Sequence, residues 1–378
     1  MATGRYGKAY TASDFFTEGY PSLQDCIKFL DPQNVRDIEA KPSPGIAQGA
    51  HSYSVRIGYS SFAQFRKSSD RLDHETLQLA HEKYGTLGPR KMTESVLANL
   101  WVYEMRYKGG YSLHKAMQLW GYGVPLPTSP YYSPLRETGL IPGRLQASVE
   151  SFARHVLVLS LFCSAGRITP SPETPVDYTT HDKYVAALNK LSHILPERFH
   201  EVIELLKTNL ATLYASDWPQ AVNNLGLCPA VLKVDLETGE LKSCSSWSHV
   251  SVGPFGITVS SLEHLLGGID DHGNWVHVHH HEQLRMAFTY TLTVGQYWGK
   301  DIRLGYARML GSFFNFKNGF GNLLLNETYD MDACSHRIAF LDAVVLEPMA
   351  RMSTIPIETR RQYELALQNM HDGVNYSY

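Results

Sequence analysis

The chain has 378 residues, of which 43% are hydrophobic and 19% charged, a composition typical of a globular protein rather than a disordered one. Its 34 basic and 37 acidic residues give a formal net charge of −3, which excludes a general positive field for nucleic acid or anionic lipid. Five cysteines without a CxxC pair argue against a disulfide framework or a zinc knuckle and fit a reducing compartment. With no apolar leader and no long apolar stretch, we expect a soluble cytoplasmic protein without a membrane partner.

The first part of the chain predicts a small sheet that carries one helix. Residues 1–45 lack a clear period and are expected to form an N-terminal extension. The alternating aromatic and β-branched residues of 50–66 predict a hairpin. Apolar residues at helical spacing predict a helix over 72–84, with Asp70 or Asp73 as its cap, and 93–105 predicts a strand or strand pair.

The second part is mostly helical. Apolar residues recur at helical spacing over 145–162, 183–195 and 199–214, whereas the Pro- and Thr-rich stretch 168–175 predicts an exposed loop. Two short strands, 230–235 and 240–246, are joined by a turn that contains Gly239. The helical pattern then continues to about Gln368.

This order of elements indicates an α+β fold with two lobes. We expect a small antiparallel-sheet N-lobe over 46–106, with a hinge near 103–106, and a larger, mostly helical C-lobe over 107–378 that contains the inserted hairpin 230–246. A small β-rich lobe followed by a helical one is typical of kinase-like folds, in which ligands bind between the lobes.

Several motifs then carry a resemblance to a known family. They lie between Gln48 and Phe288 in this order: QGAHSYSV (48–55), AQFR (63–66), LDHETLQLAHEKYG (72–85), VYEM (102–105), the block 223–256, and LEHLLG (262–267). Together they resemble the fungal branch of the aminoglycoside/choline phosphotransferase-like family. The resemblance implies a protein-kinase-like fold in which QGAHSYSV covers phosphates, Arg66 is the nucleotide-contacting cation and VYEM is the hinge.

The catalytic segment departs from that family's pattern. The family reads N-H-G-D-L-x-x-x-N-I-L-V-D-x-E-T-G, whereas residues 223–239 read NNLGLCPAVLKVDLETG. In this register Gly226 stands for the catalytic aspartate, Val231 for the Mg²⁺-binding asparagine, and Ser246 for the metal-binding aspartate of a D-W pair. Phosphoryl transfer needs these oxygen groups, and Mg²⁺ favours hard anionic oxygen. We therefore expect a pseudoenzyme with no cofactor and no metal site.

The function expected from this combination is non-kinase chemistry in fungal secondary (specialised) metabolism. A small organic substrate would bind between the lobes and undergo cyclisation, rearrangement or a pericyclic step, so that the chain is a cyclase or isomerase. Two alternatives stay open: a pseudokinase-type binding or regulatory protein, and an aminoacyl-tRNA-dependent amide-forming enzyme. Nucleic acid is not an expected partner, and the sequence does not specify an oligomeric state.

The site residues follow from the same comparison. Four side chains are candidates for donating hydrogen bonds to developing charge, namely Arg66, Asn224, Ser246 and His51. Six more residues are candidates for binding the substrate, namely Tyr53, Tyr103, Gly226, Val231, Cys228 and Trp247.

Other arrangements were weighed against simpler explanations. Arg66 could instead pair with Glu75 or Glu82 of the neighbouring helix. Cys228 and His249 could form a nucleophile and base pair, but a buried cysteine is also an apolar filler. The histidines of a Trp-containing hairpin could suggest zinc, although a surface hairpin rich in histidine is more often solvated; they are His272, His277, His279, His280 and His281.

Overall fold

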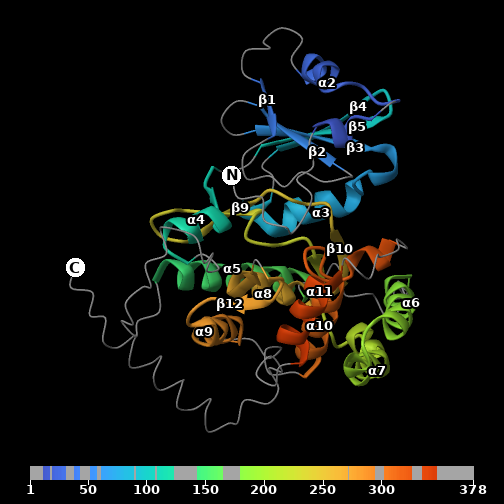
Figure 1. The fold of residues 1–378 in the computed structure, drawn as a ribbon, viewed down its shortest axis with the longest axis vertical. Helices are drawn as coiled ribbons and strands as arrows, with labels where there is room; N and C mark the ends of the chain where they lie inside the picture. Colours follow the sequence, from blue (N-terminus) through green and yellow to red (C-terminus); the bar gives the residue numbers. More distant parts are fainter. Residues whose placement is uncertain are drawn as a thin grey trace, which may run out of the picture.

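The computed structural model describes residues 12–17, 19–30, 38–42, 52–57, 61–88, 91–106, 109–122, 143–164, 179–270, 272–293, 302–325 and 334–346. A small lobe built on an antiparallel sheet lies at one end of the molecule, and a larger lobe made mainly of helices lies at the other (Figure 1). The predicted α+β class, with a small antiparallel-sheet lobe followed by a mostly helical lobe, is confirmed.

The N-lobe sheet has five antiparallel strands in the order β1-β2-β3-β5-β4. The strands are β1 (Ile38–Pro42), β2 (Ser52–Ile57), β3 (Ser61–Lys67), β4 (Lys91–Leu97) and β5 (Leu100–Arg106). The hairpin predicted over 50–66 corresponds to β2 and β3, and the strand pair predicted over 93–105 corresponds to β4 and β5. Pairing of Ser54 with Gln64 and of Arg66 with Trp101 fixes the register.

The two faces of this sheet have different partners, because successive side chains of a strand point to opposite sides. One face carries apolar residues that pack with the N-terminal helices α1 (Ala12–Phe15) and α2 (Leu23–Leu30). The other face contributes Phe62, Tyr103 and Met105 to the main core, which continues into the C-lobe. Gln64 and Arg66 of β3 lie on that second face and are also buried.

The N-terminal segment belongs to the N-lobe rather than to a separate extension ending at residue 45. Phe15 of α1 is fully buried, with its ring 6.0 Å from that of Tyr53 and 4.8 Å from that of Phe16. Cys26 and Ile27 bury one side of α2, and β1 is an edge strand of the sheet. The expected domain boundary is therefore too late, because a short aromatic helix gives little periodic signal in the sequence.

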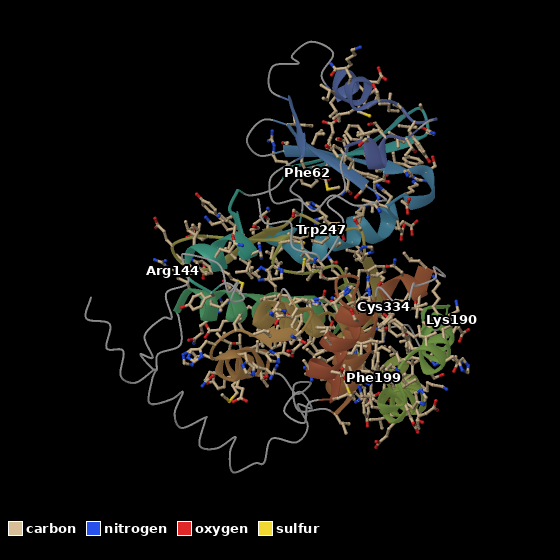
Figure 2. All side chains as sticks on the ribbon, in the orientation of Figure 1. Phe62, Arg144, Lys190, Phe199, Trp247 and Cys334 are labelled. Carbon is tan, nitrogen blue, oxygen red and sulfur yellow. The ribbon has the colours of Figure 1, made fainter. Side chains whose placement is uncertain are left out.

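Helix α3 (His74–Tyr84) connects the two lobes. Asp73, one of the two predicted caps, accepts a hydrogen bond from the backbone N–H of Glu75. The helix ends at Gly85, whose φ is 51°. Tyr84, at its last turn, donates from its hydroxyl to the carbonyl of Val222 at 3.2 Å. Its ring meets the edge of Trp247 with centroids 4.9 Å apart, and Figure 2 shows Trp247 between the lobes.

The C-lobe core is formed mainly by helices. They are α4 (Leu113–Leu119), α5 (Gly143–Ser164), α6 (Thr179–Ile194), α7 (His200–Asn209), α8 (Leu262–Leu266), α9 (His281–Thr293), α10 (Ile302–Phe314) and α11 (Ser335–Leu341). Phe152 of α5 packs on Phe288 of α9, with ring centroids 5.8 Å apart. The three helices predicted between 145 and 214 are confirmed as α5, α6 and α7. Across the described ranges, no helix is long and apolar enough to cross a membrane.

Short strands within the C-lobe hold the segments that form the site. The predicted hairpin over 230–246 appears as β8 (Leu232–Val234) and β9 (Leu241–Cys244), which extend a small sheet begun by β6 (Tyr111–Ser112). A second pair, β7 (Gln220–Asn224) and β10 (Val250–Pro254), was not predicted. A hairpin of β11 (Gly267–Ile269) and β12 (Trp275–His277) completes the lobe. The loop predicted over 168–175 and the helical continuation beyond 346 lie outside the described residues.

Candidate functional site

Arg66 of β3 reaches from the N-lobe to the C-lobe. Its Nη1 donates to Ser248 Oγ at 2.9 Å, across 182 residues of sequence, and to Gln64 Oε1 at 3.2 Å. Its Nε donates to the backbone carbonyl of Asp70 at 2.5 Å. The side chain, only 5% exposed, is therefore held in one orientation by three hydrogen bonds. Arg66 does not form the alternative ion pair with Glu75 or Glu82 of α3.

These hydrogen bonds leave the charge of Arg66 without a partner carboxylate. The three acceptors are a hydroxyl, a side-chain amide and a backbone carbonyl, all of them neutral. Within the described ranges, no carboxylate forms a salt bridge with Arg66, although the charge of Asp70 acts on it. Burial lowers the pKa of Arg66, but a guanidinium stays charged in proteins. A guanidinium held in a fixed orientation therefore lies at the junction of the lobes.

The turn that follows β7 lies on the C-lobe side of this junction. Asn223 accepts from the backbone N–H and the hydroxyl of Thr258, at 3.2 and 3.0 Å. Asn224 donates from Nδ2 to the carbonyl of Ser246 at 2.9 Å and accepts from the N–H of Gly226 at 3.0 Å. Both ends of the Asn224 amide are thus bonded to backbone, so this side chain positions the turn.

Gly226 is packed directly against His249. A Cβ built on Gly226 would lie 2.9 Å from His249 Cδ2 and 3.3 Å from Asn224 Oδ1, so any larger residue must displace one of them. The His249 ring also stacks on Phe316, with centroids 3.6 Å apart and an interplanar angle of 8°. The backbone reinforces the arrangement, because Leu225 donates to the carbonyl of His249 at 3.1 Å and accepts from Phe316 at 3.1 Å.

The rest of the predicted catalytic segment is part of the apolar core. Cys228 and Val231 are 6% and 4% exposed, and the carbonyl of Cys228 accepts from the N–H of Val231 at 3.0 Å. On the neighbouring strand, burial raises the pKa of the Cys244 thiol to about 12, and the thiol donates to the carbonyl of Ser246. Cys244 is therefore a neutral thiol at physiological pH.

The structure brings some predicted site residues together and separates others. Arg66, Asn224, Gly226 and Ser246 belong to the segments that meet at the junction, and Trp247 packs there while donating from Nε1 to the carbonyl of Cys244 at 3.1 Å. Tyr53 does not lie at the junction. Its side chain is 1% exposed and packs on the opposite face of the sheet, against Phe15 and Phe16.

Tyr103 lies in the core beside the start of α3. Tyr103 is fully buried, and its hydroxyl accepts from the backbone N–H of Leu72 at 3.1 Å, which fixes the start of the segment leading into α3. Tyr53 therefore packs away from the junction, whereas Tyr103 lies on the same face of the sheet as Arg66 and is held within the core. His51 lies outside the described residues.

Sequence reasoning missed Ser248 and Phe316 and gave His249 a different role. Ser248 directly follows the Ser246-Trp247 pair, so its position next to the motif could have identified it as a candidate site residue. His249 was considered only as a partner of Cys228, whereas its ring contacts Gly226 and Phe316. Phe316 lies two residues beyond the end of α10, and no local pattern connects it to the turn that follows β7.

The histidine-rich hairpin lies elsewhere in the C-lobe. The rings of His277 and His281 stack with centroids 4.2 Å apart, and those of His279 and His280 lie 4.0 Å apart. Over the ranges covered by the structure, no three His, Cys, Asp or Glu side chains gather in a way that could hold a metal ion.

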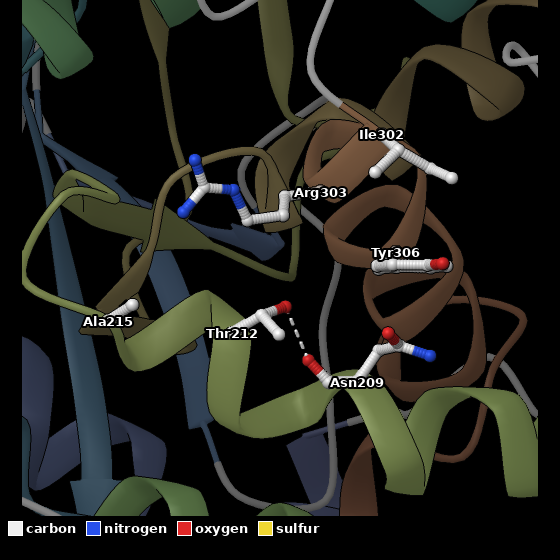
Figure 3. A pocket seen from close by; sticks show the side chains of 6 residues that line it. All are labelled: Asn209, Thr212, Ala215, Ile302, Arg303 and Tyr306. Carbon is white, nitrogen blue, oxygen red and sulfur yellow. Dashed lines mark hydrogen bonds between the residues drawn. The ribbon is translucent and has the colours of Figure 1, made fainter.

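A surface depression of about 480 Å³ lies in the C-lobe, between α10 and the segment that ends α7. Figure 3 shows Arg303 and Tyr306 of α10 facing the end of α7, where Thr212 donates to the carbonyl of Asn209 at 2.7 Å. Arg303 also pairs with Asp217 at 2.9 Å. No predicted site residue lines this depression.

Neither a scan of family models nor a search of curated proteins finds a match to the chain. Solved structures do match. Aminoglycoside-3'-phosphotransferase of type VIII is 17% identical with a TM-score of 0.44, covering 76% of this chain and 97% of that one. Choline kinase LicA from Streptococcus pneumoniae is 9% identical with a TM-score of 0.45, covering 84% and 96%. Plasmodium vivax ethanolamine kinase is 12% identical with a TM-score of 0.45, covering 86% of each chain.

These matched structures are those of kinases and phosphotransferases. At these identities and TM-scores the likeness is one of general fold. It carries no information about the roles of individual residues or about the reaction.

Proposed function

We propose that the chain is an enzyme that does not transfer phosphoryl groups, and that it binds a small organic molecule at the junction of its lobes. The reaction is a cyclisation, rearrangement or isomerisation that needs no ATP, in a pathway of secondary metabolism. The proposal rests on the chemistry of the side chains that meet at the junction.

The single observation that carries this proposal is the contact between Gly226 and His249. Phosphoryl transfer needs a carboxylate that orients the attacking hydroxyl. The resemblance assigns that carboxylate to the position of Gly226, where an imidazole instead fills the space in front of the glycine. A carboxylate side chain built there would meet the His249 ring, so the substitution is supported by packing as well as by alignment.

The residues that should hold Mg²⁺ do not fit that ion. Val231 supplies no side-chain oxygen and is 4% exposed in the core. Ser246 offers a neutral hydroxyl, and its carbonyl already accepts from Asn224 and Cys244. Because Mg²⁺ prefers carboxylate oxygen, this donor set is a poor match for a magnesium nucleotide. No step of the proposed reaction passes through a metal ion.

The groups that remain suit proton transfer and charge stabilisation. Ser248 and His249 are consecutive, so the hydroxyl that accepts from Arg66 is adjacent in the chain to the imidazole. Stacking on Phe316 fixes the plane of that imidazole. In the proposed reaction Arg66 stabilises negative charge that develops on a substrate oxygen, and His249 gives or takes a proton. Fixed donors of this kind are effective because they need little reorganisation during the reaction.

A second candidate is a pseudokinase-type binding protein. It is favoured by the three hydrogen bonds that fix Arg66, because a guanidinium held by neutral groups can bind a ligand without converting it. The two candidates differ in one respect: only the enzyme converts its ligand, and only the enzyme depends on the imidazole of His249.

Gene deletion and complementation test the proposal and separate the candidates. Deletion in the encoding organism, followed by comparative metabolite profiling, is expected to remove a product and accumulate its precursor. Complementation with His249→Phe is expected to leave the precursor unconverted. The matched control is His272→Gln, which changes an exposed histidine of the C-lobe hairpin and is expected to restore the product. Full restoration by His249→Phe would argue against catalysis by this imidazole and favour the binding protein.

A further inference from the structure

Three charged side chains meet in the interior of the C-lobe, away from the lobe junction. Glu263 of α8 accepts from Arg285 of α9 at 2.8 Å through one carboxylate oxygen, and from Arg308 of α10 at 2.8 Å through the other. Glu263 is fully buried, and Arg285 and Arg308 are 6% and 2% exposed. The three residues therefore form a buried cluster that ties three helices together.

The charges of this cluster do not balance. An arginine keeps its proton in proteins, so two guanidinium groups face one carboxylate. Glu263 is the only carboxylate among the buried polar residues of the described ranges. Electrostatic attraction to both arginines lowers the pKa of Glu263 even though burial opposes the shift, so the carboxylate is ionised. The cluster thus carries one positive charge in excess in a region from which water is largely excluded.

Two hydrogen-bond donors of the cluster are also unused. The Nε atoms of Arg285 and Arg308 are both buried, and neither has a hydrogen-bond partner in the structure. Buried donors are normally paired, and a charged donor is costly to leave unpaired. A water molecule could accept such hydrogen bonds, but it would not neutralise the charge. A small anion would supply both an acceptor and the missing negative charge.

We propose that a small monovalent inorganic anion of the chloride class binds beside Arg285 and Arg308 and neutralises the cluster. One negative charge matches the single positive charge in excess. A spherical anion accepts N–H donors from several directions and needs no particular orientation. The site supports the packing of α8, α9 and α10 and is independent of the proposed reaction.

Thermal unfolding of the purified full-length chain tests this proposal without any knowledge of a substrate. Chloride is increased at constant ionic strength by replacing gluconate, which is too large for a buried site. The melting temperature is expected to rise by about 2 to 4 °C and then reach a plateau, because an anion that binds only the folded state stabilises it by mass action. A melting temperature that is indifferent to chloride would overturn the proposal.

Two variants locate the effect, and a third controls for it. Arg285→Met leaves a neutral pair and is expected to abolish the chloride dependence, whereas Glu263→Gln leaves two arginines and is expected to increase it. The control is Arg198→Met, which removes an arginine of the exposed pair with Asp342 and is expected to keep the wild-type dependence.

If Arg285→Met does not fold, bromide in crystals of the wild type is the second measurement. An anomalous peak beside the two Nε atoms would support the site, and a map without one would contradict it.

Discussion

The Nη1 atom of Arg66 in the N-lobe donates to the hydroxyl of Ser248 in the C-lobe at 2.9 Å. This hydrogen bond places a buried guanidinium one residue away from His249, the imidazole that lies in front of Gly226. A group suited to anion stabilisation and a group suited to proton transfer therefore belong to adjoining parts of the site, and the position of Gly226 offers no carboxylate. The predictions below follow from this arrangement and from the packing that supports it.

Replacement of Gly226 by leucine should disable the site. Its Cβ would lie within 2.9 Å of His249 Cδ2, so the imidazole must move from its stacked position on Phe316. Misplacement of a proton-transfer group by about 1 Å costs roughly a hundredfold in rate. Metabolite conversion in a complemented deletion strain is the measurement. Gly305→Leu is the matched control, because nothing lies within 4 Å of a Cβ at that helical position. Equal conversion by both variants would show that the site does not include the contact between Gly226 and His249.

Neutralisation of Arg66 should lower conversion about a hundredfold or more while the fold persists, since loss of one preorganised donor typically costs roughly 10²- to 10³-fold. Arg66→Met keeps most of the side-chain volume but removes the charge and the contact with Ser248. Arg71→Met is the control, because Arg71 pairs with Glu94 at the surface of the same lobe at 2.9 Å. Conversion is compared alongside the circular dichroism spectrum of each variant. Wild-type conversion by a folded Arg66→Met protein would exclude the guanidinium from the reaction.

Stability should fall with acidity because of His264. Burial lowers the pKa of this histidine to about 4, and its Nδ1 faces the amide of Asn318 at 3.3 Å. The folded state therefore binds fewer protons than the unfolded state between pH 6.5 and about 4, so stability is retained above that window and lost as pH falls through it. The expected slope is about 1.4 kcal/mol per pH unit for this one group.

Chemical denaturation at several pH values measures this slope. His264→Gln keeps an acceptor beside Asn318 but does not titrate, so its dependence on pH should be shallower than that of the wild type. His272→Gln, at an exposed position, should leave the wild-type slope unchanged. An identical slope for His264→Gln and the wild type would assign the acid sensitivity to other groups.

The N-terminal helix should be necessary for the stability of the N-lobe. Phe15 is fully buried against Tyr53, so Phe15→Ala is expected to cost about 3 to 5 kcal/mol of unfolding free energy. Phe29→Ala is the control, because Phe29 is 38% exposed and its truncation should cost much less. Equilibrium denaturation compares the two variants. Equal stabilities would mean that residues 12–30 are dispensable, as the expected extension implied.

Elements governed by local signals could be predicted from the sequence. Alternation defines β2 and β3, and the cap at Asp73 with Gly85 as the stop defines α3, because a strand face and a helix end depend on nearby residues. The pair β7 and β10 was missed, since Gln220-Ala-Val-Asn-Asn224 is short and does not alternate. Its pairing depends on a distant partner strand.

The candidate site could be predicted only in part. Comparison of motifs located Arg66, Gly226 and Ser246, because each lies within a recognisable segment. It also selected Tyr53, which lies on the opposite face of the sheet, and Tyr103, whose hydroxyl accepts from Leu72 within the core. The contact of His249 with Phe316 joins segments that are far apart in the chain, so only packing in three dimensions reveals it.

The most direct test of the proposed function is conversion of the accumulated precursor by purified protein in the presence of apyrase and EDTA. Apyrase removes ATP and EDTA removes Mg²⁺, so phosphoryl transfer stops under these conditions. Conversion at an undiminished rate, with no mass increase corresponding to a phosphoryl group, is the expected result. Conversion that requires magnesium and ATP and is lost in Arg66→Met would contradict the proposal and identify a phosphotransferase.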